Sequence, residues 1–182
     1  MKRRAARDAR ASEEPSLTRT ATPSHLTEGT LIIIDLDKME EIIKERGWSE
    51  YKPNPATGLL TMLVEEFSRQ HRAVVVYGLD EKRGTEEAIL EIPMVEPGEI
   101  AEDLVKIADT ICKEANVSVT IVAVTSIVGS KPARTRRDAY TGIRGEARKI
   151  LTMLKRKGGG VVYIDGSIVY TSPCRRTSHP EP

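Results

Sequence analysis

Two apolar runs constrain the fold of this chain more than any other feature of its sequence. Leu31–Ile34 is entirely apolar and mostly β-branched, and Val119–Val124 is interrupted only by Thr120. A strand with one face in water alternates apolar and polar residues, so these continuous runs predict strands that are buried on both faces. Neither run approaches the length of a membrane span, and no apolar segment follows the basic N-terminus. We therefore expect a cytoplasmic protein with no membrane partner.

The spacing of the other apolar residues predicts the order of the elements. Helical periodicity indicates a helix capped by Asp35 or Asp37, further helices that begin at Asn54–Pro55 and at Pro97, and a basic helix that ends at Gly158. Alternation and turn residues indicate strands over 73–77 and 87–94 and a terminal hairpin over 161–170. The order is strand–helix–helix–strand–strand–helix–strand–helix–strand–strand. It predicts an α+β fold of two layers, with a mainly antiparallel sheet and helices packed on one face.

The chain has 182 residues, which is enough for one domain with tails. Residues 1–27 lack apolar periodicity and are rich in Arg, Ala, Ser, Thr and Pro, so we expect a disordered basic arm. Residues 28–172 form the predicted domain, and residues 173–182 are expected to be a disordered tail. Cys112 falls in an apolar helical pattern and Cys174 in this tail, so two separate cysteines are favoured over a redox pair, a disulfide framework or a metal site.

Charge is strongly segregated along the sequence, although the net formal charge is only +1. Residues 28–130 carry 10 basic and 20 acidic side chains, a net charge of −10, whereas residues 131–157 carry 10 basic and 2 acidic side chains, a net charge of +8. An acidic body with one concentrated basic segment indicates a localised anionic partner. Asn and Gln together number only three, a bias that fits a protein selected for heat.

The basic segment has the pattern of an amphipathic helix with a stripe of cations. At 100° per residue, Arg137, Arg144, Arg148 and Lys155 fall on one stripe that faces away from the sheet, and Tyr140 lies at its boundary with the packing face. Neighbouring cations repel one another, and a phosphate backbone would relieve the repulsion and release counterions. The alternative is a solvated charged face that pairs with the acidic body. The residues that define the packing face are Ala139, Ile143, Ala147, Ile150, Leu151 and Leu154.

Aromatic residues extend the predicted interface beyond this helix. Trp48 and Tyr51 lie beside Lys52 in a loop where large aromatic side chains have no obvious structural role, and stacking of a base on such a ring contributes about 1–3 kcal/mol. The alternative is that Trp48 folds back over the core. The predicted nucleic-acid interface comprises Lys131, Arg134, Arg136, Arg137, Tyr140, Arg144, Arg148, Lys149, Lys155, Trp48, Tyr51 and Lys52.

Carboxylates after the first buried strand offer a different function. Asp35 and Asp37 flank Leu36, and Asp80 lies in the turn of the first predicted hairpin. Carboxylates at a strand end can hold Mg²⁺. This arrangement and the element order resemble the palm domain of nucleotidyl cyclases and polymerases, which implies a metal-dependent nucleotide enzyme. The turn lacks the Gly-Gly-acid-acid sequence of the cyclases, and a strand end with a helix cap explains the same residues. We therefore expect a protein that is not an enzyme and needs no cofactor.

A third alternative comes from Gly142 and Gly145. A Gly-x-x-Gly sequence followed by a helix resembles the phosphate clamp of KH domains, which bind RNA. A glycine inside a helix costs about 1 kcal/mol relative to Ala, so either the helix begins after Gly145 or a backbone approaches closely here. Residues 131–139 do not form the regular apolar helix that a KH domain would place before the clamp.

Three stretches carry a resemblance to a known family: Ile-Ile-Ile-Asp-Leu-Asp-Lys at 32–38, Lys-Pro-Asn-Pro at 52–55, and the Arg-rich segment 134–151. They resemble the ThermoDBP-related proteins, archaeal single-stranded DNA-binding proteins that do not use an OB-fold. The resemblance covers about residues 29–170. It implies an α+β domain whose basic, partly aromatic cleft takes the bases of single-stranded DNA, with the cations of 131–157 and Tyr140 in the matching positions.

RNA remains an alternative ligand. The founding members of this family dimerise through a long C-terminal helix, whereas no heptad pattern follows Tyr170. The resemblance therefore leaves open whether this chain forms a homo-oligomer.

Overall fold

A six-stranded sheet organises the protein, and β1 (Thr27–Leu36) and β4 (Val119–Val128) form its centre. In the computed structural model, which describes residues 26–49, 51–129 and 132–175, the strand order is β2-β3-β1-β4-β5-β6. Neighbouring strands are antiparallel except β4 and β5, which run parallel. The predicted α+β class with a mostly antiparallel sheet is confirmed. The outer strands are β2 (Val74–Tyr77), β3 (Glu87–Pro93), β5 (Val161–Ile164) and β6 (Ser167–Thr171).

The helices follow the predicted order, with one difference. They are α1 (Met39–Arg46), α2 (Pro55–His71), α3 (Ala101–Ala115), α4 (Arg136–Ala139) and α5 (Ile143–Arg156), and a 3₁₀ turn at Pro97–Ile100 leads into α3. The difference is that the basic segment forms two helices, α4 and α5, instead of one.

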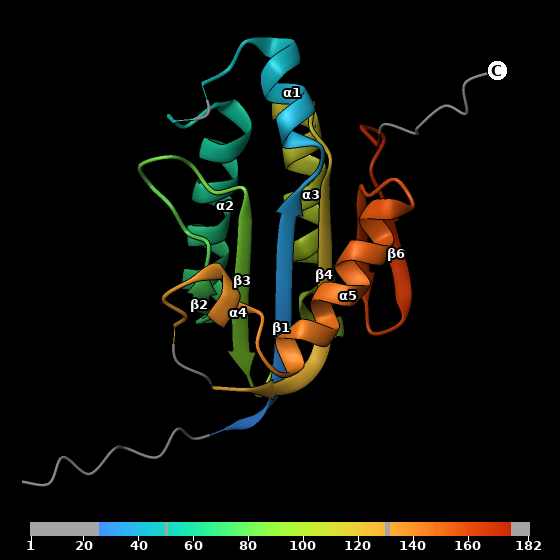
Figure 1. Ribbon diagram of the computed structural model, residues 1–182. Coiled ribbons are helices and arrows are strands. Elements are labelled where there is room, and N and C mark those ends of the chain that lie inside the picture. Colours follow the sequence, from blue (N-terminus) through green and yellow to red (C-terminus); the bar gives the residue numbers. More distant parts are fainter. Residues whose placement is uncertain (1–25, 50, 130–131, 176–182) are drawn as a thin grey trace, which may run out of the picture.

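The two apolar runs are buried on both faces, as predicted. In β1, Ile32 and Ile34 point into a core shared with α1, α2 and α3, whereas Leu31 and Ile33 point into a second core under α4 and α5. Figure 1 shows α2 and α3 behind the sheet and α5 in front of it. The first three helices thus form the expected layer. The expectation that all helices share that face is corrected by α4 and α5, because a strand that is apolar on both faces needs cover on both.

The N-terminal ends of α1 and α2 are built differently. Asn54 caps α2 as predicted, since its side chain accepts hydrogen bonds from the backbone N–H groups of Ala56 (3.1 Å) and Thr57 (3.0 Å). Neither Asp35 nor Asp37 caps α1, which begins after Lys38 without a side-chain cap. The predicted capping role of these aspartates is therefore wrong.

Asp37 has another structural role. The residue is 4% exposed, and its carboxylate accepts hydrogen bonds from the hydroxyls of Ser118 (3.0 Å) and Thr120 (2.7 Å) and from the backbone N–H of Gly160 (2.8 Å). These bonds tie the end of β1 to β4 and to the turn that precedes β5. Three donors satisfy a charge that would otherwise be costly to bury.

The two glycines of the basic segment explain why it forms two helices. Gly142 has a φ of 61° and is the N-cap of α5, so the chain leaves the helical conformation between the end of α4 at Ala139 and the start of α5 at Ile143. Gly145 lies in the first turn of α5, where an added Cβ would be only 3.1 Å from the carbonyl oxygen of Tyr140. The close backbone approach that the sequence allowed as an explanation is therefore present at Gly145. Gly142 is exposed between α4 and α5, whereas Gly145 is half-buried inside α5.

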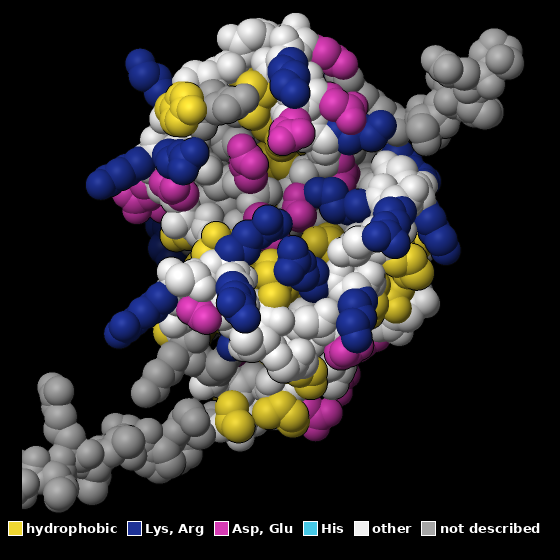
Figure 2. Space-filling model, viewed as in Figure 1, with side chains coloured by type: hydrophobic (Ala, Val, Ile, Leu, Met, Phe, Trp, Pro, Cys, Tyr) yellow, Lys and Arg dark blue, Asp and Glu magenta, His cyan; other side chains and the backbone are white. Residues whose placement is uncertain are grey.

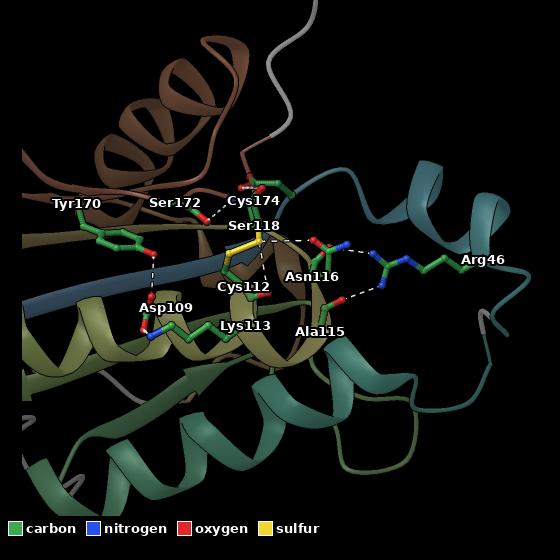
Figure 3. The surroundings of a disulfide bond; sticks show 11 residues. Arg46, Asp109, Cys112, Lys113, Ala115, Asn116, Ser118, Tyr170, Ser172 and Cys174 are labelled. Atoms are coloured by element: carbon green, nitrogen blue, oxygen red, sulfur yellow. Dashed lines mark hydrogen bonds and ion pairs between the residues drawn. A yellow bond between two sulfur atoms is a disulfide. The ribbon is translucent and has the colours of Figure 1, made fainter.

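The chain after β6 is more ordered than predicted. Cys112 in α3 forms a disulfide with Cys174, so the prediction of two separate cysteines is wrong (Figure 3). Pro173–Arg175 lie against the domain, although they were assigned to a disordered tail. The cysteines are 62 residues apart, and no local periodicity reports that the chain end returns to α3. The rest of that tail, residues 176–182, and residues 1–25 of the predicted arm lie outside the described part of the chain.

Candidate nucleic-acid interface

The basic segment covers the front face of the sheet. Figure 2 shows Lys and Arg side chains gathered over α4 and α5, with acidic side chains between them and the β2–β3 hairpin. The cations divide into an inner set that pairs with the sheet and an outer set that lines a groove. The two sets have different chemistry and must be considered separately.

The inner cations form ion pairs with carboxylates that β1 and β3 present on this face. The Nε of Arg136 lies 2.8 Å from Oε2 of Glu87, and the hydroxyl of Tyr140 donates a hydrogen bond to the same carboxylate. The Nε of Arg144 lies 3.4 Å from Oε1 of Glu91. This second pair is deeply buried, since the side chains of Arg144 and Glu91 are 11% and 2% exposed.

A third inner pair joins the last turn of α5 to β1. The Nζ of Lys155 pairs with the carboxylate of Asp35 and donates to the carbonyl of Leu36 at 3.0 Å. The pairing with the acidic body, which the sequence left as the alternative to nucleic-acid binding, is thus present for Arg136, Arg144 and Lys155.

The expected orientation of Arg144 and Ile143 is reversed. Arg144 was expected to face away from the sheet, yet it faces Glu91, while Ile143 was assigned to the packing face and is 48% exposed. The signal that could have shown this is the heptad spacing between Arg144 and Leu151, because seven residues place two side chains within about 20° on a helix. Leu151 is buried, and Arg144 shares its face.

The outer cations line a groove along the exposed side of α5. The groove has a volume of about 510 Å³. Its cations form two adjacent pairs, Arg148 with Lys149 and Arg156 with Lys157, which lie about two helical turns apart. Met153, 42% exposed, lies between them and offers an apolar surface. The residues that line the groove are Gly145, Arg148, Lys149, Thr152, Met153, Arg156 and Lys157.

Two of these cations already have neighbours in the structure. The guanidinium of Arg148 stacks over the ring of Tyr140, 4.3 Å from its centroid, and Lys149 pairs with Glu146 at 2.7 Å on the exposed surface. Tyr140 itself is 9% exposed and covered on this side by Arg148, so stacking on a base would require Arg148 to move. Exposed pairs such as Lys149–Glu146 are weak, typically below about 1 kcal/mol, and are easily exchanged for a phosphate.

Arg156 and Lys157 belong to this groove but were not among the predicted contacts. Their signal in the sequence is the spacing of seven residues between Lys149 and Arg156, which places the two side chains within about 20° on a helix, and Lys157 follows directly. The prediction instead followed Lys155, which lies beside them but turns inward to Asp35.

The remaining predicted contacts are not gathered with the groove. Trp48 is half-buried against the core that lies under α1, α2 and α3, and the guanidinium of Arg46 is 4.8 Å from the centroid of its ring. Trp48 therefore folds back over the core. Tyr51, 76% exposed, and Lys52 lie on the loop between α1 and α2. Arg134 and Arg137 are exposed at the start of α4, and Lys131 lies outside the described residues.

The alternative metal ligands are only partly brought together. Asp35 and Asp80 line one cavity of about 320 Å³ between the end of β1 and the β2–β3 turn, whereas Asp37 is held by buried hydrogen bonds and lies 3.8 Å from the Nζ of Lys155, the cation that also pairs with Asp35. Asp80 accepts hydrogen bonds from the backbone N–H groups of Lys82 and Arg83, both at 2.9 Å, as in an Asx turn. Across the described residues, no three His, Cys, Asp or Glu side chains are grouped as a metal site would require.

The carboxyl group of Asp35 has an unusual pKa. Burial raises it to about 6, and the nearby Lys155 only partly offsets this rise. The folded protein therefore holds a proton on Asp35 at pH values where the unfolded chain does not.

A comparison of the chain with models of known protein families finds no match, and a comparison with curated protein sequences finds none. In the described ranges, no helix is both long enough and apolar enough to cross a membrane.

Replacing Arg144 tests the division into inner and outer cations. We expect Arg144→Ala to lower the free energy of unfolding by about 1.5–3 kcal/mol, because it removes one charged partner from the buried carboxylate of Glu91, which keeps its hydrogen bond from the backbone N–H of Gly129. Chemical denaturation measures this change. Arg137→Ala, at an exposed position in α4, is the matched control and should change stability by less than about 0.5 kcal/mol. Equal stability of the two variants would contradict the inner role of Arg144.

The pKa of Asp35 gives a second prediction. Because the folded state binds this proton more tightly, Asp35 should lower stability as the pH rises from about 4 to about 6, and the loss should persist above that range. Carboxyl ¹³C NMR should show Asp35 titrating near pH 6. Lys155→Met should raise this pKa further, because it removes the nearby cation that lowers it. A titration below the ordinary aspartate pKa would contradict the dominance of burial.

Proposed function

We propose that the protein binds single-stranded nucleic acid along the groove on the outer face of α5, without a cofactor. The observation that carries this proposal is the set of four cations that line one groove: Arg148, Lys149, which pairs with the exposed Glu146, Arg156 and Lys157. Like charges placed this close repel one another in the isolated protein, and phosphates relieve that repulsion.

The form of the groove supports a single strand as the ligand. The cations occupy both ends of a stretch of eight residues, about 12 Å along the helix axis, and can follow a flexible backbone. Met153 and Thr152 lie between the two pairs and offer a surface against which an unstacked base can pack. A base that is free of a duplex can reach such a surface, whereas a paired base cannot.

The inner ion pairs support the same proposal. They fix the rotation of α5 on the sheet, so the outer cations are held in place before the ligand binds. A preorganised site loses less side-chain entropy on binding. DNA is chosen over RNA because of the resemblance to the ThermoDBP-related proteins.

A pair of double variants tests the groove. Lys149→Ala with Arg156→Ala should weaken binding of a labelled DNA single strand in fluorescence anisotropy. The slope of log affinity against log salt should become shallower by about 1.4, since each phosphate contact contributes about 0.7 for single strands. The matched control is Arg69→Ala with Lys106→Ala, which removes two exposed cations from α2 and α3 on the other face.

The control variant should bind within about twofold of the wild type, because these charges lie outside the groove. Equal losses in the two double variants would mean that only net charge attracts the ligand. A flat salt response in the wild type would contradict the proposal.

A second candidate is a metal-dependent palm-type nucleotide enzyme. It is favoured by the cavity that Asp35 and Asp80 share at the end of β1. The pairing of Lys155 with both Asp35 and Asp37 weighs against it, as do the three hydrogen bonds that Asp37 already accepts. The chemistry of this candidate requires carboxylates that are available to a divalent cation.

Release of phosphate or pyrophosphate from nucleoside triphosphates, with and without Mg²⁺, distinguishes the two candidates. We expect no turnover, and oligonucleotide binding that does not depend on Mg²⁺. Turnover that requires Mg²⁺ and is lost in both Asp35→Asn and Asp80→Asn would instead support the enzyme.

A further inference from the structure

A disulfide holds the segment that closes the end of α5. Cys112 lies in the last turn of α3 and is 5% exposed, and Cys174 follows β6 and is half-buried. Figure 3 shows the two sulfur atoms joined between α3 and the C-terminal segment, with Asn116 beside them. The disulfide therefore fixes residues 172–175 to a part of the domain that is remote in sequence.

That segment packs on the turn after α5. The guanidinium of Arg175 donates a hydrogen bond to the carbonyl of Lys157, and the backbone N–H of Ser172 donates to the carbonyl of Gly160 at 2.7 Å. An added Cβ at Gly158 or Gly160 would lie 2.9 Å from the side chain of Arg175, so this side chain fills the space above the turn. A cation that binds the last carbonyls of a helix stabilises that end, and Arg175 is such a cap for α5.

The turn capped by Arg175 comes directly after two of the four groove cations in the chain. Arg156 ends α5 and Lys157 is its C-cap residue. If the end of the helix frays, both side chains lose their fixed positions, and binding must then order them at an entropic cost. Chain ends that are not tied to a domain are poorly ordered, and the disulfide is the covalent tie that adds to the hydrogen bonds of Ser172 and Arg175.

We propose that the Cys112–Cys174 disulfide is a redox switch for the α5 groove: when formed, it holds Arg175 on the end of the helix, and when reduced, it releases Arg175 and weakens nucleic-acid binding. This inference rests on the proposed function of the groove. Reduction by a dithiol transfers two electrons and two protons to the disulfide, breaks the S–S bond and leaves two thiols, while the dithiol becomes a disulfide. Cys174 is the more exposed of the two, so its sulfur is the first point of thiolate attack and Cys112 leaves as the thiolate.

The test compares oligonucleotide affinity of the full chain before and after reduction with dithiothreitol. Reduction should weaken binding by about threefold to tenfold, because the freed cations must be ordered again on binding. The double variant Cys112→Ser with Cys174→Ser should bind like the reduced protein and should not respond to dithiothreitol. Arg175→Ala should weaken binding by a similar factor while its disulfide remains intact.

Arg46→Ala is the matched control for Arg175→Ala. The guanidinium of Arg46 caps α3 in the same manner, through the carbonyls of Ala115 (2.7 Å) and Asn116 (2.8 Å), and it also lies near the disulfide (Figure 3). The Arg46→Ala substitution removes the same charge and the same kind of C-terminal cap, but from a helix that does not line the groove. We expect the oligonucleotide affinity of Arg46→Ala to stay within about twofold of that of the wild type.

The possible outcomes separate the switch from the function on which it rests. Absence of binding by the oxidised protein would overturn the proposed function and the switch together. Equal affinity of the oxidised and reduced forms would overturn the switch alone. Should reduction unfold the protein, Arg175→Ala decides the matter, because wild-type affinity in that variant would overturn the switch. Faster hydrogen exchange at the end of α5 in Arg175→Ala, together with weaker binding, would support it.

Discussion

Carboxylates on the front face of the sheet determine how α4 and α5 lie on it. The apolar contact that α5 makes with the sheet is narrow, since only Ala147, Leu151 and Leu154 of this helix are fully buried. A narrow apolar stripe fixes the distance of a helix from a sheet better than it fixes rotation about the helix axis. The Arg144–Glu91 and Lys155–Asp35 pairs supply the missing constraint, because each joins one position on the helix to one position on a strand. A buried ion pair contributes little net stability, but a wrong rotation would leave its charges buried and unpaired.

The sequence predicts those parts of the fold that depend on local chemistry. The run Leu31–Ile34 predicts a strand covered on both faces, Asn54–Pro55 predicts the start of α2, and Asp165–Gly166 predicts the final hairpin. In each case the cause is a property of a few adjacent residues: continuous apolarity, a side-chain cap, or a turn with positive φ. The concentration of charge in 131–157 likewise predicts a surface on which cations gather. Local chemistry cannot decide which of those cations face inward.

Three of the features that were missed depend on partners remote in sequence. Arg144 faces inward because it pairs with Glu91 on β3. Asp37 does not cap α1 because its carboxylate accepts hydrogen bonds from donors on β4 and before β5. Cys174, after β6, forms a disulfide with Cys112 in α3. The break at Gly142 adds a second source of error, since a helical wheel drawn through it assigns the wrong phase to the residues that follow. Glycine is a weak signal for such a break, because one glycine inside a helix costs only about 1 kcal/mol.

The burial of the inner ion pairs has a consequence for the outer ones. Salt screens charges that are exposed to solvent much more than charges that are buried, with a Debye length of about 8 Å at physiological ionic strength. Arg144 and Glu91 are removed from solvent, whereas Lys149 and Arg156 are exposed to it. Raising the salt concentration should therefore weaken the proposed attraction of the groove for phosphates while the helix that carries the groove keeps its place on the sheet. If the same cations both held the helix on the sheet and bound the ligand, salt would weaken the position of the helix and the binding together. The cations of α5 are divided between two faces, so salt can act on binding alone.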